Sequence, residues 1–182
     1  MRRLALLLTV TLAPALFAQQ TSPQVSPPEM SEDYNPLVWQ GDDANFALNT
    51  LQSNFCAAEF SRLAASRTTN LELHDLAQSA AREQSGVYHK LRSMAKAFSI
   101  WLPPESQLQK CPDLEHARSL SGDDFDKAYL TSLQHTNQAN VSAMQAEIAR
   151  LQKPNNAPLR HLASITLPHL EQLQTKTESA AK

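Results

Sequence analysis

Residues 70–98, which read NLELHDLAQSAAREQSGVYHKLRSMAKAF, decide the fold of this chain. The stretch contains no proline and is rich in Ala, Leu, Gln, Glu and Lys, which favour helices. The pattern predicts a helix over residues 70–99 that begins at a capping box formed by Thr69 and Glu72 and ends before the two prolines at 103–104. The apolar side chains are spaced by three, four or seven residues, as on one face of a helix; they are Leu73, Leu76, Ala80, Val87, Leu91, Met94 and Phe98.

The rest of the sequence contains three more windows of this kind. No proline occurs between positions 37 and 102 or between 113 and 153, and a proline inside a helix costs about 3 kcal/mol. Apolar periodicity predicts helices over three further ranges: 43–67, 122–152 and 157–178. Four helices with stripes near a 3.5-residue period predict an all-α fold, an antiparallel four-helix bundle over residues 43–179. Pro168 is expected to kink the last helix.

The composition excludes several classes of function. A chain of 182 residues suffices for one domain. It has only three glycines, so a Rossmann or P-loop phosphate site is not expected. The 16 basic and 18 acidic residues provide no positive field for nucleic acid. The acidic balance and the lack of a face rich in Lys and Arg also argue against membrane association through amphipathic helices.

The N-terminal residues predict export to the periplasm or the medium. Two arginines precede the apolar run of residues 4–17, and the small residue Ala18 follows it; these are the parts of a signal peptide over residues 1–18. The run is shorter than the roughly 20 residues that span a bilayer, so no transmembrane span is expected in the mature chain, with an uncleaved anchor as the alternative. Residues 19–42 predict a flexible Pro- and Ser-rich leader, of which residues 37–39 are expected to dock onto the domain.

Cys56 and Cys111 are the only two cysteines. Two cysteines in an oxidising compartment usually form a disulfide. Cys56 lies in the predicted helix 43–67, and Cys111 lies in the loop that joins the second helix to the third. The start of the first helix and the end of the second lie at the same end of an antiparallel pair, so contact is feasible and a disulfide is predicted, with two free thiols as the alternative.

The stretch SGDDFDKAYL, residues 121–130, resembles a known family motif. It is similar to the pattern SG-x-x-FD-x-x-YL of exported bacterial helical proteins grouped as domain of unknown function 4142. The Leu-Pro pairs at 102–103 and 167–168 and the position of Glu59 are similar to that family as well. The resemblance covers residues 43–178 and implies a ferritin-like four-helix bundle, secreted or periplasmic, without an established activity. The main motif residues are Ser121, Gly122, Phe125, Asp126, Tyr129, Leu167 and Pro168.

Two amide side chains are predicted in the core. The resemblance implies that Gln84, Asn137 and Leu173 stand where relatives carry histidine, and Ala57 where they carry an acidic residue. Heptad spacing from apolar neighbours places both amides inside. A buried amide without a partner costs about 1–3 kcal/mol, so Gln84 and Asn137 are expected to bond to each other or to a shared water. This pair is interpreted as a contact that fixes helix register, with the relic of a functional site as the alternative.

Catalytic and metal chemistry receive little support from the sequence. No G-x-S-x-G, C-x-x-C or Glu-x-x-His motif occurs, so no catalytic residue and no cofactor is predicted. Glu59 is a weak candidate for a metal ligand, with an ion pair to a Lys or Arg as its alternative role. Gln, Asn and Leu are poor ligands for transition metals. The leading hypothesis is therefore a non-catalytic envelope protein that binds an unidentified protein or small molecule; a ferritin-like metal-binding protein or oxidase is the alternative.

Overall fold

The computed structural model describes residues 39–108, 110–151 and 156–181. These residues form five α-helices and one turn of 3₁₀-helix and contain no strand, so the predicted all-α fold is confirmed. The expected signal peptide and the expected leader up to residue 38 lie outside the described residues. None of the described helices is long and apolar enough to cross a membrane.

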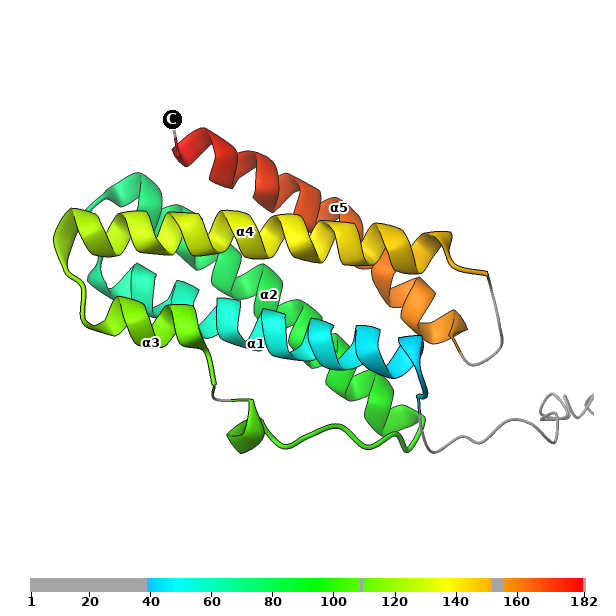
Figure 1. Cartoon of the computed structure of the whole chain (residues 1–182). Helices are drawn as coiled ribbons and strands as arrows, with labels where there is room; N and C mark the ends of the chain where they lie inside the picture. The colour runs from blue at the N-terminus through cyan, green and yellow to red at the C-terminus, as the bar shows by residue number, and fades with distance from the viewer. Residues whose placement is uncertain (1–38, 109, 152–155, 182) are drawn as a thin grey trace, which may run out of the picture. The chain divides into compact units, whose positions relative to one another are not determined.

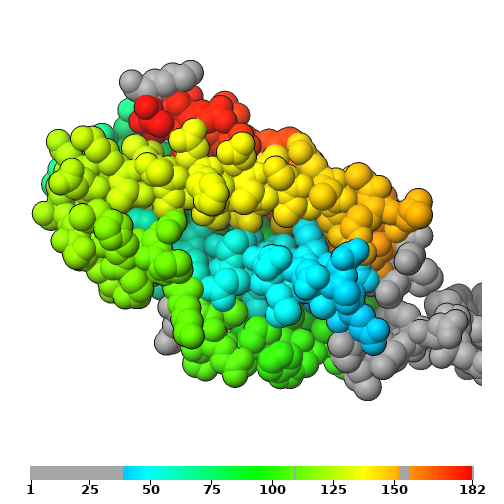
Figure 2. Space-filling model, viewed as in Figure 1, coloured from blue at the N-terminus to red at the C-terminus, as the bar shows by residue number. Residues whose placement is uncertain are grey.

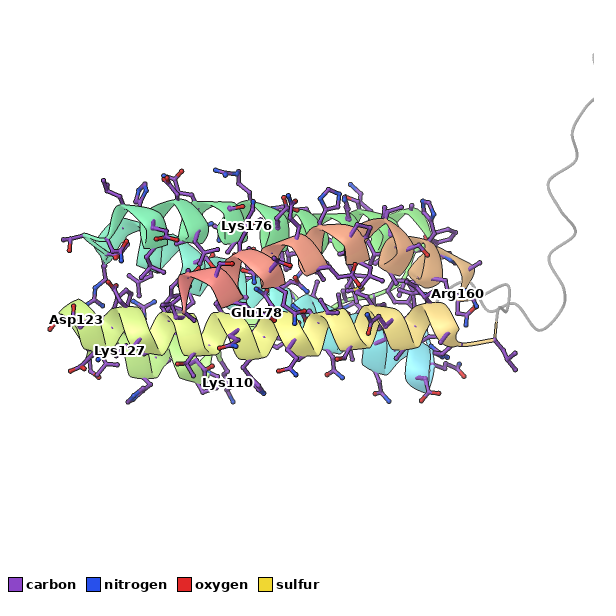
Figure 3. The ribbon with its side chains drawn as sticks, turned by 90° about the horizontal axis from the view of Figure 1, so that it is seen from above. Lys110, Asp123, Lys127, Arg160, Lys176 and Glu178 are labelled. Carbon is purple, nitrogen blue, oxygen red and sulfur yellow. A yellow bond between two sulfur atoms is a disulfide. The ribbon has the colours of Figure 1, made fainter. Side chains whose placement is uncertain are left out.

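Four long helices make up most of the described residues (Figure 1). They are α1, Asp42–Arg67; α2, Leu71–Ala97; α4, Gly122–Ala149; and α5, Ala157–Ala180. Helices α1 and α5 each pack on both α2 and α4. Figure 3 shows Asp123, near the start of α4, and Arg160, near the start of α5, at opposite ends of the helices, so these two neighbours run antiparallel.

The start of α2 corrects one prediction. Asn70, not Thr69, caps the helix, because Asn70 Oδ1 accepts hydrogen bonds from the backbone N–H groups of Glu72 at 3.0 Å and Leu73 at 3.2 Å. An asparagine oxygen satisfies the free N–H groups of a first helical turn as well as a serine or threonine does. The predicted capping box was therefore wrong by one residue.

The link between α2 and α4 contains more structure than the loop that was predicted. It includes the 3₁₀ turn Glu105–Gln107 and a short helix, α3, Pro112–Arg118. Pro112 suits the first turn of a helix, where its missing N–H would have no helical partner. Leu114 and Ala117 are buried, and α3 lies on the face formed by α4 and α1 (Figure 2), the two helices it contacts.

The Cys56–Cys111 disulfide is present and ties the start of α3 to α1. The two Cα atoms are 5.4 Å apart. Gln52 Nε2 donates to the backbone oxygen of Leu108 at 3.0 Å, so a hydrogen bond supports the same junction. The disulfide and this partly buried hydrogen bond therefore hold the link against α1.

The apolar core lies between the four long helices. Phe60 packs with its ring edge against Phe125 and Tyr129, at centroid distances of 6.0 and 5.2 Å. Trp39, the one described residue of the triplet at 37–39, is buried in the same cluster. Helix α5 continues through Pro168, although proline lacks the N–H that the helix would use at that position.

Candidate functional site

Gln84 of α2 and Asn137 of α4 meet in the middle of the helices. Both side chains are fully buried, and their amide groups are 3.3 Å apart. Because α2 and α4 otherwise pack on α1 and α5, this hydrogen bond crosses the core between two helices that are not neighbours. The structure thus brings together the two amides that heptad spacing placed inside.

The other end of the Gln84 amide lies among three oxygen atoms. Ser61 Oγ is 3.3 Å away, and the carbonyl oxygens of Ala57 and Ala80 are 3.1 and 3.2 Å away. A carbonyl oxygen can only accept, so we place the amide nitrogen of Gln84 at this end. Its oxygen then faces Asn137, and the contact joins a donor to an acceptor when the Asn137 amide turns as well, so that the Thr177 hydroxyl donates to Asn137 Oδ1 instead of to the Leu173 oxygen.

Hydroxyl groups extend the amide pair to all four long helices. The Thr177 hydroxyl of α5 lies 3.2 Å from the Asn137 amide and 2.8 Å from the carbonyl oxygen of Leu173. The Tyr129 phenol of α4 donates to Ser61 Oγ of α1 at 3.1 Å. These contacts form one buried row, which we call the central network: Tyr129, Ser61, Gln84, Asn137 and Thr177.

The central network carries no charge. Burial raises the pKa of Tyr129 above the ordinary value of a phenol, and the hydrogen bond to Ser61 only partly offsets this effect. Removal from water disfavours the charged form of an acidic group, so Tyr129 stays a neutral donor. The other four members have side chains that do not ionise.

The rest of the 121–130 motif lies where α4 begins. Gly122 has a positive φ of 55°, a conformation that glycine adopts without strain. The guanidinium of Arg67 lies over the Phe125 ring, 4.3 Å from its centroid, and Arg67 also donates to the backbone oxygen of Leu120. Asp126 Oδ2 accepts from the Thr68 hydroxyl at 2.9 Å. Phe125 and Asp126 therefore hold the start of α4 against the turn that follows α1.

Three other motif residues stand apart from these contacts. Ser121 is the N-cap residue of α4, but its side chain makes no capping hydrogen bond. Leu167 is half-buried and packs on a separate cluster that contains Met144 and Leu170. Pro168 lies beside it within α5. The central network does not include any of the three.

Of the four positions that the resemblance relates to histidine or acidic residues, Gln84 and Asn137 belong to the central network, and Ala57 and Leu173 border it. The Ala57 oxygen lies beside Gln84, and the Leu173 oxygen lies beside Thr177. A transition metal needs imidazole or carboxylate donors, whereas the side chains here are two amides, a methyl group and an isobutyl group. Within the described ranges, no three His, Cys, Asp or Glu side chains are placed to hold a metal ion. These residues do not fit the metal that a ferritin-like fold implies.

Glu59 lies away from the centre. Its carboxylate forms an ion pair with Arg62 on the same helix, and its side chain is 40% exposed. Arg62 also donates to Ser85 Oγ of α2 at 2.6 Å. Glu59 is thus placed as a surface partner of an arginine, the alternative role that its position beside the core stripe suggested.

Two members of the central network were missed from the sequence. Ser61 and Thr177 are polar, and the predicted core faces were traced through apolar residues. Their spacing offered a signal, because Thr177 follows Leu170 by seven residues and Ser61 follows Ala58 by three. A short hydroxyl side chain on an inward stripe is a candidate partner for a buried amide.

A second polar cluster, which was not predicted from the sequence, lies at the C-terminal end of α4. Arg150 Nη1 contacts Asp43 Oδ1 at 2.8 Å and Glu147 Oε2 at 2.7 Å. Both carboxylates are buried. The hydrogen bond that Arg150 donates to Glu147 is the largest cause that raises the pKa of Arg150. One arginine therefore neutralises charge on two helices, which is a structural role for this cluster.

Comparison with known proteins identifies a family but not an activity. The family model described as "Domain of unknown function (DUF4142)" matches residues 28–180, which is most of the chain. No curated protein and no solved structure shows significant similarity to this chain.

Proposed function

The chain belongs to the family described as domain of unknown function 4142, and from this membership we propose that it is an exported envelope protein that acts by binding and not by catalysis. The proposal includes the type of fold. Helices α1, α2, α4 and α5 form an antiparallel four-helix bundle of ferritin-like order, in which the link through α3 joins the two parallel helices α2 and α4. The packing of α1 and α5 on both α2 and α4 supports this order.

The neutrality of the central network is the observation that carries the proposal. In a metalloprotein of this architecture, carboxylates and imidazoles from several helices converge in the core. Here amides and hydroxyls occupy the same place and use their hydrogen-bonding capacity on one another. The centre is suited to holding four helices in register, which leaves the surface as the part that binds.

Two observations support an extracytoplasmic location. The disulfide between Cys56 and Cys111 is of the kind that persists in oxidising compartments. The basic and apolar residues 1–18 have the composition of a signal peptide. We therefore assign the mature protein to the periplasm or the medium.

Elemental analysis tests the non-metal part of the proposal. The protein is purified from cells grown with added iron, manganese and zinc, and the metal content per chain is measured. We expect far less than one ion per chain. A variant with Gln84→His and Asn137→His, whose fold is checked by circular dichroism, serves as the control with two central imidazoles. A stoichiometric metal in the wild-type protein would overturn the proposal and favour a ferritin-like metalloprotein or oxidase.

Cell fractionation and thiol titration test the location. We expect the protein in the periplasmic fraction or the medium, with a mass lower by the first residues and with no thiol that reacts after unfolding. Retention in the cytoplasm at full length, with two reactive thiols, contradicts the assignment.

A further inference from the structure

The end of α2 exposes aromatic side chains that a folded domain normally buries. Phe98 is 37% exposed and Trp101 is 71% exposed. They belong to residues 97–104, AFSIWLPP, a run without any charged residue. A shallow hollow lies beside them, lined by Arg92, Ser93, Ala95, Lys96, Ile100, Trp101 and Leu102. Exposed apolar groups gathered in this way mark a surface that interacts with something.

Hydrogen bonds hold this surface in one conformation. The backbone N–H of Ile100 donates to the Ala95 oxygen at 2.8 Å, and Ser99 between them has a positive φ of 55°; this is the Schellman arrangement of a helix end. Arg92 donates to the Pro103 oxygen at 2.7 Å and to the Tyr88 hydroxyl at 2.6 Å. The segment is therefore pinned to α2: Ile100 and Leu102 pack against the core, and Phe98 and Trp101 are left exposed.

The local charge is opposite to that of the whole chain. Residues 84–104 contain Lys90, Arg92 and Lys96 and no acidic residue, whereas the chain has a net charge of −2. The next acidic residue, Glu105, accepts a hydrogen bond from the Tyr88 hydroxyl at 3.4 Å. Exposed aromatic rings thus lie next to Lys96 on this surface, a combination that suits a partner with both negative charge and apolar groups.

We propose that this end of α2 docks onto the surface of an anionic lipid bilayer. Trp101 and Phe98 enter the interfacial layer, where the amphipathic indole of tryptophan is favoured, and Lys96 lies against the head groups. A bilayer fits better than an acidic protein segment because the exposed rings of Phe98 and Trp101 lie at a helix end, beside a hollow that is shallow and open. The surface differs from the amphipathic helix faces that the sequence argued against, since it is built from a helix end.

The proposal rests on the proposed envelope location for access to such a bilayer, but its test does not. Trp39 and Trp101 are the only tryptophans, so Trp39→Phe leaves Trp101 as the single fluorescent reporter. Vesicles of phosphatidylcholine, with or without half phosphatidylglycerol, are added to the purified protein at low salt. We expect a blue shift of Trp101 emission and co-sedimentation with the anionic vesicles only.

Variants with matched controls locate the binding surface. Lys96→Glu is expected to weaken binding to anionic vesicles more than about fivefold, since one charge near such a surface contributes about that factor. Trp101→Ala is expected to weaken binding as well, since it removes the ring that enters the interfacial layer. Lys176→Glu and Leu71→Ala change an exposed lysine and an exposed leucine elsewhere and are expected to leave binding unchanged. High salt is expected to release the wild-type protein.

Three results would overturn the proposal. The first is no emission shift with anionic vesicles, the second is equal loss of binding in the Lys96 and Lys176 variants, and the third is a shift with polyglutamate but not with vesicles, which would indicate an acidic protein partner. None of these results tests export. A cytoplasmic location found by fractionation would contradict the proposed envelope location without contradicting vesicle binding.

Discussion

The Thr68 hydroxyl donates a hydrogen bond to Asp126 Oδ2 at 2.9 Å, and its oxygen accepts one from the backbone N–H of Asn70 at 3.2 Å. Asn70 in turn caps α2. A carboxylate in the first turns of α4 thus helps to hold the turn from which α2 begins. This relationship gives the 121–130 motif a structural role, because Asp126 couples the two halves of the helical domain.

Asp126→Ala is expected to lower the free energy of unfolding by about 1–3 kcal/mol, because it removes the charged acceptor of a partly buried hydrogen bond. Urea denaturation measures the loss. Asp124→Ala, an exposed residue of the same turn, is the control and is expected to change stability by less than about 0.5 kcal/mol. If Thr68→Val and Asp126→Ala have additive effects in a double-mutant cycle, the coupling does not exist.

Gln84→Leu is expected to cost about 1–3 kcal/mol of stability, because it leaves the Asn137 amide buried without its partner. Replacing both amides by leucine is expected to cost less than the sum of the two single substitutions, since no buried amide is then stranded. Thermal and urea unfolding of the four proteins give this comparison. A gain of stability in Gln84→Leu alone would contradict the paired amides.

Apolar and proline patterns were sufficient to predict the helical class and the long helices, because these depend on local propensity and on a period of about 3.6 residues. The start of α2 was displaced by one residue, since Thr69 and Asn70 are both good caps and only the course of the chain decides between them. Helix α3 was missed. Its seven residues are too short for a periodic signal, and its stability depends on Cys111 and on burial of Leu114.

The site was harder to predict than the fold for a similar reason. Gln84 and Asn137 could be placed inside from heptad spacing, but their partners depend on which helices are adjacent. Ser61 lies on α1 and Thr177 on α5, and spacing within one helix does not show that they meet. The Arg150 cluster likewise joins the first turn of α1 to the end of α4, a contact between residues far apart in the sequence.

Tyr129 is expected to make the protein less stable at alkaline pH. Its pKa in the folded state is raised above the ordinary value of 10.0 by burial. Its stabilising effect is therefore complete below pH 10 and is lost as the pH rises above it, because the unfolded chain releases the proton first. Above pH 10 the free energy of unfolding is expected to fall more steeply than in Tyr129→Phe, by about 1.4 kcal/mol per pH unit. Parallel slopes in urea denaturation between pH 9 and 11.5 would contradict this assignment.

Ser99→Gly is expected to stabilise the protein by about 0.5–1 kcal/mol. Ser99 adopts a φ of 55° at the end of α2, a conformation that strains a residue with a Cβ and that glycine adopts freely. The relief of strain exceeds the larger conformational entropy that glycine has in the unfolded chain. Ser93→Gly, an exposed serine inside α2, is the matched control and is expected to lose several tenths of a kcal/mol, because glycine is a poor helix former. Thermal denaturation separates the two outcomes. Losses of equal size at both positions would show that the Ser99 backbone is not strained, and would contradict a fixed turn before Trp101.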